Sequence, residues 1–326
     1  MDFSILRQVF SSEFKGPNGE LVDHMILPNE LVHYTSAQAA FDIISARDDK
    51  RCLWLRNATE MNDFKELSYG QELIAEAFDD PQFNDEFNSA YRALGPDTAD
   101  VSKLMEESLD AIRRSTFLLS LSQHSASELE SGRLSMWRAY GGNANVALVF
   151  NVEPIYSGEY SWPVIISSVK YDGVDEVRRT LRHILAGMIE QKSHLEKLPG
   201  SSIENALKDA FEVLLLTTKH PGFSEEQEWR LIHRDTSPPL FEGMVGIPSK
   251  IACIGGIVQK IHYLPFRRPD QTEVTPTGLN ELLAQIIIGP TSNEAIVKDG
   301  FVQLLRDAKV DDPESRVTVS GIPLRR

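Results

Sequence analysis

The chain has 326 residues, 41% of them hydrophobic and 25% charged, which is the length of one large or two ordinary domains and the composition of a globular protein. Its formal net charge of -15 argues against a broad nucleic-acid-binding surface, because nonspecific affinity for phosphates comes from lysine and arginine. Two cysteines are too few for a disulfide framework, and no apolar run reaches the roughly 20 residues of a membrane span. We therefore expect a cytoplasmic protein with no membrane partner.

The first part of the chain predicts strands that lead directly into helices. After an N-terminal extension of residues 1–28, residues 31–35 predict a strand, and Ser36 can cap a helix with Ala37, Ala40, Phe41 and Ile44 on its apolar stripe. Residues 51–57 predict a second strand, which ends in a polar turn. The pattern from 64 to about 114 is helical and is broken at Pro81 and at residues 95–97, which predicts two or three helices.

The remaining chain alternates irregularly between strand and helix patterns. Helices are predicted near 135–140, at 174–195, at 202–219 and at 293–308, and strands at 115–122, 145–151, 163–171, 226–234, 285–289 and 316–320. No glycine-rich dinucleotide fingerprint follows a strand. We therefore predict a single α+β domain over residues 29–326, with a mixed sheet and large helical insertions at about 64–114 and 174–219.

The segment EEQEWRLIHR, residues 225–234, carries two carboxylates and an arginine at alternate positions. On a strand, Glu226, Glu228 and Arg230 share one face, because strand side chains alternate with a period of two. Such a row could hold a sugar hydroxyl and stabilise positive charge at an anomeric carbon. The alternative is an ordinary solvated face of charged side chains.

Polar and aromatic residues at three other places have both a functional and a structural interpretation. His33 could contact a ribose or phosphate or satisfy a backbone group, whereas Tyr34 favours packing and Thr35 capping. Trp137 and Tyr140 lie three residues apart, which is typical of core packing or of a platform for a planar base. Arg56 and Arg138 could contact phosphates, although turn formation also explains the polar cluster around Arg56.

Other chemistries have little support in the sequence. The eight histidines are scattered rather than spaced as metal ligands, so we expect no metal. Ser120, Ser122 and His124 are close in sequence, but a serine hydrolase also needs a positioned base and an oxyanion hole, and no nucleophile motif marks this stretch.

Several short segments in a fixed order resemble one bacterial family. LVHYTS, LWLRNATEMNDFKE, FLLSLS, MWRAYG, ALVFN, EEQEWRLI, IIIGP and SGIPLRR are similar to the domain-of-unknown-function family numbered twenty-nine seventy-one, over about residues 29–326. The chain departs from that family's usual asparagine-aspartate-proline turn, since Phe64 follows Asp63. The family carries no established activity.

The pattern also resembles ADP-ribosyltransferase-like folds. This looser resemblance implies a mostly antiparallel, split central sheet and NAD as the substrate, with no metal. His33 would match the histidine that orients NAD, Ser120 or Ser122 the hydroxyl residue of a later strand, and Glu228 the glutamate that holds a ribose hydroxyl as nicotinamide leaves. Glu226 would match the acidic residue that engages the acceptor. Further candidates for contacting NAD are Tyr34, Thr35, Arg56, Trp137, Arg138, Tyr140 and Arg230.

The resulting expectation is an NAD-consuming transferase, of the kind that could act as a toxin or phage-defence effector, with an acceptor of unknown class. A protein, a nucleic acid or a small molecule could serve as that acceptor. The alternative is a module that binds a nucleotide or a protein without turnover.

Overall fold

The structure is a computed structural model that describes residues 4–10, 28–46, 51–60, 65–98, 100–139, 144–152, 164–171, 173–235, 247–254, 256–266 and 277–323. Contacts within the chain divide it into two compact units. One comprises Met1–Leu27, Ala58–Thr116 and Val169–Ser224, and the other comprises Pro28–Asn57, Phe117–Ser168 and Glu225–Arg326. A single domain over 29–326, with its predicted insertions, stays a prediction.

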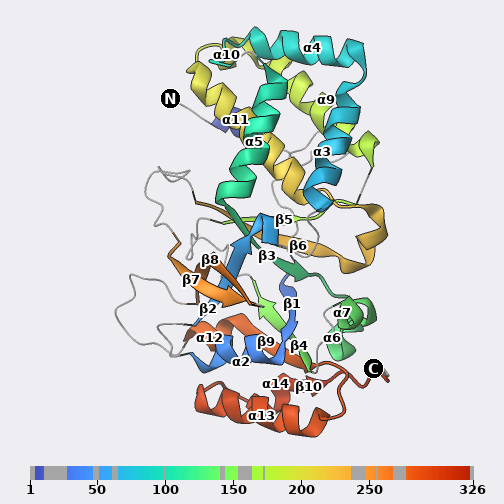
Figure 1. The fold of residues 1–326 in the computed structure, drawn as a ribbon, viewed down its shortest axis with the longest axis vertical. Helices are drawn as coiled ribbons and strands as arrows, with labels where there is room; N and C mark the ends of the chain where they lie inside the picture. The colour runs from blue at the N-terminus through green and yellow to red at the C-terminus, as the bar shows by residue number, and fades with distance from the viewer. Residues whose placement is uncertain are drawn as a thin grey trace. The chain divides into compact units, whose positions relative to one another are not determined.

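The first unit is helical. The prediction of two or three helices between 64 and 114 is confirmed, and two of them start at aspartate caps: Asp80 Oδ1 accepts from the backbone N–H of Gln82 at 3.0 Å, and Asp100 Oδ1 from that of Ser102 at 3.0 Å. Pro81 therefore begins a helix rather than breaking one. The helices are α1 (Ser4–Phe10), α3 (Lys65–Phe78), α4 (Pro81–Arg92), α5 (Val101–Ser115), α9 (Val174–Glu190), α10 (Lys192–Leu195) and α11 (Gly200–Thr217), with the 3₁₀ turn η2 (Ala58–Glu60) (Figure 1).

The second unit is built on the sheet, whose strand order is β10-β9-β4-β1-β3-β2-β8-β7, with β6 pairing both β3 and β5 (Figure 1). The strand pairs with a described register are antiparallel except for β9 and β10, so the predicted α+β class with a mixed, mostly antiparallel sheet is confirmed. The strands are β1 (Glu30–Ser36), β2 (Cys52–Asn57), β3 (Thr116–Ser122), β4 (Asn145–Asn151), β5 (Ile165–Ser168), β6 (Glu228–Arg234), β7 (Ser249–Ile254), β8 (Ile257–Pro265), β9 (Leu283–Ile288) and β10 (Val317–Val319).

Helices and turns accompany this sheet. They are α2 (Ala37–Ser45), α6 (Glu128–Ser131), α7 (Leu134–Ala139), the 3₁₀ turn η3 (Pro221–Glu226), α12 (Thr277–Leu282), α13 (Glu294–Asp307) and α14 (Pro313–Arg316). The predicted cap of α2 is confirmed, because Ser36 Oγ accepts from the backbone N–H of Ala39 at 3.1 Å. Ala40 and Ile44 are buried as predicted, whereas the side chain of Phe41 is exposed.

The central strand β1 runs through the core of the sheet unit. It pairs along its whole length with β4, from Glu30 opposite Asn151 to Ser36 opposite Asn145. Leu31 on one face of the strand and Val32 and Tyr34 on the other are buried, so both faces are covered. His33 therefore sits in the middle of a covered sheet rather than at a solvated edge.

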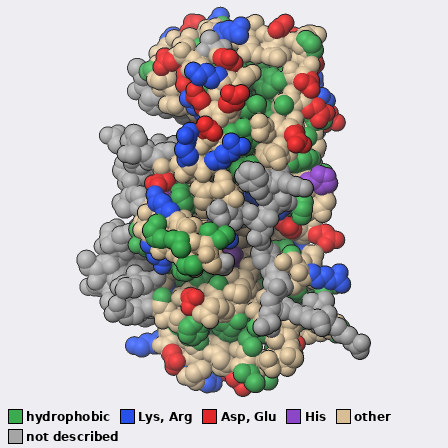
Figure 2. Space-filling model, in the orientation of Figure 1, with side chains coloured by type: hydrophobic (Ala, Val, Ile, Leu, Met, Phe, Trp, Pro, Cys, Tyr) green, Lys and Arg blue, Asp and Glu red, His purple; other side chains and the backbone are tan. Residues whose placement is uncertain are grey.

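The type of side chain on the surface differs between the helical unit and the β7–β8 hairpin. In Figure 2 charged side chains of both signs cover the helical unit, while hydrophobic side chains gather over the β7–β8 hairpin, where Ile251, Ile257 and Val258 are exposed. Within the described ranges, none of the helices combines the length and apolar character needed to cross a bilayer.

Candidate functional site

Three residues from three strands are linked in series in the sheet unit, through the backbone carbonyl and the hydroxyl of the middle one. His33 on β1 contacts the backbone oxygen of Ser120 on β3 through Nδ1, at 3.1 Å. Ser120 Oγ donates to Oε1 of Glu228, the first residue of β6, at 2.6 Å. His33 and Ser120 are half-buried and Glu228 is buried. The structure thus brings together three residues that are 87 and 108 positions apart in sequence.

The carbonyl of Ser120 determines which nitrogen of His33 carries the proton. A carbonyl oxygen accepts hydrogen bonds, so Nδ1 of His33 donates and Nε2 keeps its lone pair in the neutral ring. Burial lowers the pKa of His33, which favours this neutral form near neutral pH. The ring therefore presents an acceptor at Nε2.

Glu228 forms a buried ion pair with Arg230 on the same strand. Nε of Arg230 donates to Oε1 of Glu228 at 2.9 Å, and Nη2 donates to Oε2 at 3.0 Å. The two side chains are 5% and 4% exposed, so this two-point contact is shielded from water. It holds the plane of the carboxylate in one orientation, with the Ser120 hydroxyl on one of its oxygens.

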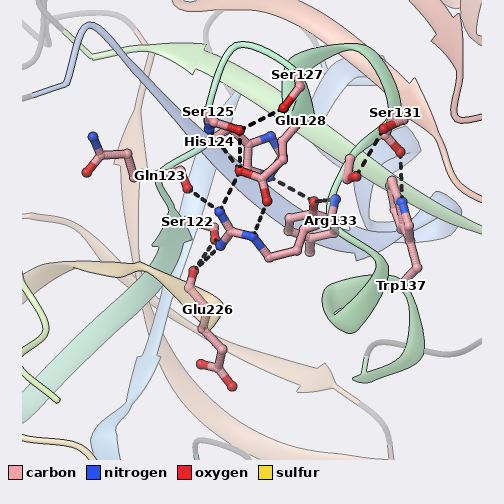
Figure 3. A network of polar contacts seen from close by, with 12 residues as sticks. Ser122, Gln123, His124, Ser125, Ser127, Glu128, Ser131, Arg133, Trp137 and Glu226 are labelled. Atoms are coloured by element: carbon pink, nitrogen blue, oxygen red, sulfur yellow. Dashed lines mark hydrogen bonds and ion pairs between the residues drawn. The ribbon is translucent and has the colours of Figure 1, made fainter. Parts of the chain in front are cut away.

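The predicted row of Glu226, Glu228 and Arg230 is wrong in its first member. The strand begins at Glu228, and Glu226 is the last residue of η3. Gln227 between them has a φ of 45°, a left-handed conformation that interrupts the two-residue alternation of a strand. The carboxylate of Glu226 consequently does not share the face of Glu228, and Figure 3 shows its side chain extending away from the contacts around Arg133.

A second polar network is centred on Arg133, which precedes α7 (Figure 3). Its Nε donates to Glu128 Oε1 at 2.6 Å, its Nη1 to Ser122 Oγ at 3.0 Å and to Glu226 O at 2.7 Å, and its Nη2 to Gln123 O at 2.7 Å and to Glu128 Oε2 at 2.9 Å. These contacts engage every N–H of the guanidinium group. Arg133 therefore joins the ends of β3 and η3 to the loop before α7.

Sequence reasoning missed Arg133 because several of its acceptors are backbone carbonyls. A signal was present in the spacing of Ser125 and Glu128, which is that of a capping box. Glu128 Oε2 accepts from the backbone N–H of Ser125 at 2.8 Å and from its hydroxyl at 2.9 Å. The hydrogen bonds from Arg133 lower the pKa of Glu128 to about 2, so the carboxylate is ionised near neutral pH.

Tyr34 extends this network rather than facing His33. Its hydroxyl accepts from the backbone N–H of Arg133 at 2.6 Å and contacts Nε2 of His124 at 2.8 Å. Burial, with the nearby charge of Arg133, lowers the pKa of His124 to about 4, so this ring is neutral near neutral pH and its Nε2 accepts from the tyrosine. Burial raises the pKa of Tyr34, so its hydroxyl stays protonated.

Trp137 lies in the core and offers no ring face for stacking. It is 0% exposed, packs edge-on against Tyr34 with ring centroids 4.7 Å apart, and donates from Nε1 to Ser131 O at 3.0 Å. Gly132 lies against the indole so closely that a Cβ there would come within 2.4 Å of Cζ2. These contacts match the core-packing alternative for Trp137 and for Tyr34.

The other candidates lie apart from the series of His33, Ser120 and Glu228. Ser122 is buried in the Arg133 network, where its hydroxyl also contacts the carbonyl of Glu226. Arg56 on β2 is half-buried and donates from Nε to Gln259 Oε1 at 3.3 Å. Thr35 is half-buried on β1, and Arg138 is exposed near the end of α7. Tyr140 lies outside the described residues.

Two histidines, on β6 and β8, and an aspartate directly after β6 form a further group. The donor atoms of His233, Asp235 and His262 all lie within 4.8 Å of one another. Their residue types are those that bind transition-metal ions.

The chain is thus an α+β protein whose mostly antiparallel sheet carries a buried glutamate–arginine pair on β6. Residues 136–231 match the model of a family described as a protein of unknown function, DUF2971, which confirms the family predicted from the motifs. The matched range includes Glu228 and Arg230 but not His33 or Ser120. No curated protein and no solved structure matches the chain.

Proposed function

We propose that the protein is an NAD-consuming, ADP-ribosyltransferase-like enzyme. The observation that carries this proposal is the series His33, Ser120 and Glu228, in which three strands contribute the residue types expected for NAD chemistry. The transferase resemblance of the sequence supplies their roles.

In the proposed reaction the bond between C1′ of the ribose and the nicotinamide nitrogen breaks. The electron pair leaves with nicotinamide, and positive charge develops on the ribose as an oxocarbenium-like species. The carboxylate of Glu228 would hold a ribose hydroxyl and stabilise that charge, once the Ser120 hydroxyl yields its place on Oε1. An acceptor hydroxyl, amine or water then attacks C1′ and loses its proton.

Arg230 and His33 have distinct parts in this scheme. The two hydrogen bonds from Arg230 keep the Glu228 carboxylate in one orientation, which reduces the reorganisation needed in the transition state. The lone pair on Nε2 of His33 accepts from a ribose hydroxyl. Glu226, outside this strand face, is proposed to engage the acceptor.

Release of free nicotinamide from NAD by the purified full chain tests the proposal. We expect Glu228→Gln to lower the rate by about 100-fold or more, because a neutral amide replaces the charge that stabilises the transition state. The matched control is Glu225→Gln, the same change on an exposed side chain three positions earlier, which should keep the wild-type rate. No release by wild type, or equal release by Glu228→Gln, rejects the catalytic role.

A second candidate is a binding module without turnover. It is favoured by the burial of Glu228, since Ser120 and Arg230 already contact both of its carboxylate oxygens. Calorimetry would then show NAD or another nucleotide binding to the full chain while no nicotinamide appears.

The acceptor class and the compartment are parts of the same proposal. Cys52 and Cys253 are both free thiols, in keeping with a reducing compartment, and we propose the cytoplasm. The proposed acceptor is a protein, a nucleic acid or a small molecule. The proposed biological role is that of a toxin or a phage-defence effector, because depletion of NAD harms a cell.

A further inference from the structure

We propose that His233, Asp235 and His262 bind a divalent transition-metal ion, with zinc as the best fit. The three side chains come from the end of β6 and from β8 and supply two imidazole nitrogens and one carboxylate. Imidazole suits zinc, copper, iron and nickel, whereas calcium and magnesium prefer oxygen ligands throughout. The donor set thus selects a borderline-soft ion.

The protonation of His262 leaves a metal-binding lone pair inside the group. His262 is 2% exposed, and its Nδ1 donates to the backbone carbonyl of Ile247 at 3.0 Å. Nε2 then carries the lone pair, and among the described residues it has no hydrogen-bond partner. A histidine that binds a metal through one nitrogen usually donates its other ring N–H to a carbonyl or a carboxylate, as Nδ1 of His262 does here.

The distances come close to those of a metal site. Donors about 2.1 Å from a tetrahedral zinc ion lie about 3.4 Å apart. Nε2 of His262 and Oδ2 of Asp235 are 3.4 Å apart, and all three donors fall within 4.8 Å of one another. Asp235 has 41% of its side chain exposed, so a rotation of this carboxylate can close the remaining gap. Three protein ligands leave a fourth position for water, as in catalytic zinc sites.

Lys260 is a competing cation that contacts the group. Its Nζ pairs with Oδ2 of Asp235, and its side chain is 43% exposed. An exposed lysine on a flexible stem can move to the other carboxylate oxygen or into water at little cost. The ion pair therefore does not block the site.

The proposed metal site is distinct from the proposed NAD site. Strand side chains alternate, so His233 lies on the face of β6 opposite Glu228 and Arg230. The ring of Phe117 packs against that of His262, with the centroids 4.4 Å apart. A metal ion held here would have no direct contact with the Glu228 carboxylate.

Calorimetric titration with Zn²⁺ tests the inference on the full chain after chelator treatment and dialysis. We expect one ion per chain, and an affinity at least about 100-fold weaker for Asp235→Asn and for His262→Gln, because each removes a ligand. His194→Gln is the matched control, because His194 is exposed on α10. This variant should bind zinc with the wild-type affinity and stoichiometry. Excess Mg²⁺ should not compete.

Asp235→Asn keeps the test decisive if the buried substitution His262→Gln fails to fold, because Asp235 is exposed. Co²⁺ added in place of zinc should give the visible absorption bands of tetrahedral coordination in wild type and not in Asp235→Asn. Equal zinc affinity of wild type and Asp235→Asn, or absence of a stoichiometric site in wild type, would overturn the proposal and leave an ordinary ion pair. Neither readout depends on NAD turnover.

Discussion

Two glutamate–arginine pairs in the sheet unit differ in what they join. Arg133 binds Glu128 and also the carbonyls of Gln123 and Glu226, so it ties the end of β3, the end of η3 and the loop before α7 together. Arg230 and Glu228 lie two residues apart on β6, so the ion pair between them lies within one strand. The first pair organises backbone and the second orients a carboxylate.

This difference bears on which pair stabilises the fold and which, under the proposed function, orients a catalytic carboxylate. An arginine that satisfies several backbone carbonyls stabilises a loop whose polar groups would otherwise lack partners. Burying an ion pair costs desolvation free energy, and such pairs are weak contributors to stability. We therefore infer that Arg133 is structural and that Arg230 is a positioning residue for Glu228.

The largest effect on stability is expected from Arg230→Met. The substitution leaves the carboxylate of Glu228 buried without its guanidinium partner, which should lower the free energy of unfolding by about 4 kcal/mol in urea denaturation. Adding Glu228→Gln should restore most of that loss, because the uncompensated charge is gone. A double variant as unstable as the single one would mean that Arg230 supports the fold through contacts other than this pair.

A somewhat smaller effect is expected from Arg133→Met. The free energy of unfolding should fall by about 3 kcal/mol, because the variant removes hydrogen bonds to a charged group and to two backbone carbonyls. The exposed Arg138 provides the control, since Arg138→Met should change stability by no more than about 0.5 kcal/mol. If the two variants are equally stable, the role of Arg133 in holding the loop is refuted.

The smallest effect is a pH dependence of the Arg133–Glu128 pair. The pKa of Glu128 is about 2 in the folded chain against an ordinary value of 4.5, so the unfolded chain binds more protons between these values. The stabilisation is present above about pH 4.5 and is lost as the pH falls toward about 2. Urea midpoints compared at about pH 5 and about pH 3 should show a smaller drop for Glu128→Gln than for wild type.

Glu130→Gln is the matched control for this measurement, because Glu130 is exposed on the same helix. It should show the wild-type drop in urea midpoint. An identical pH dependence for Glu128→Gln and Glu130→Gln would contradict the assignment of the acid-sensitive stability to the Arg133–Glu128 pair.

Local patterns in the sequence predicted most elements and one site contact. Alternating and three-to-four-residue periodicities marked the strands and helices, and Ser36 followed by an apolar stripe marked the cap of α2. The shared strand face of Glu228 and Arg230 was also predicted, from their two-residue spacing. By contrast, Gln227 carries no residue-type signal of the left-handed turn that removes Glu226 from the strand.

The sequence by itself determined the α+β class, the order of the elements and the identity of the family, because these depend on local periodicity and on short ordered motifs. The tertiary structure determined the contacts between residues that lie far apart in the sequence. It placed Ser120 between His33 and Glu228, made Trp137 a core residue, gave Arg133 its backbone acceptors and brought His262 to His233. The physical reason is that side-chain partners on different strands are selected by sheet pairing and burial, which no local spacing records.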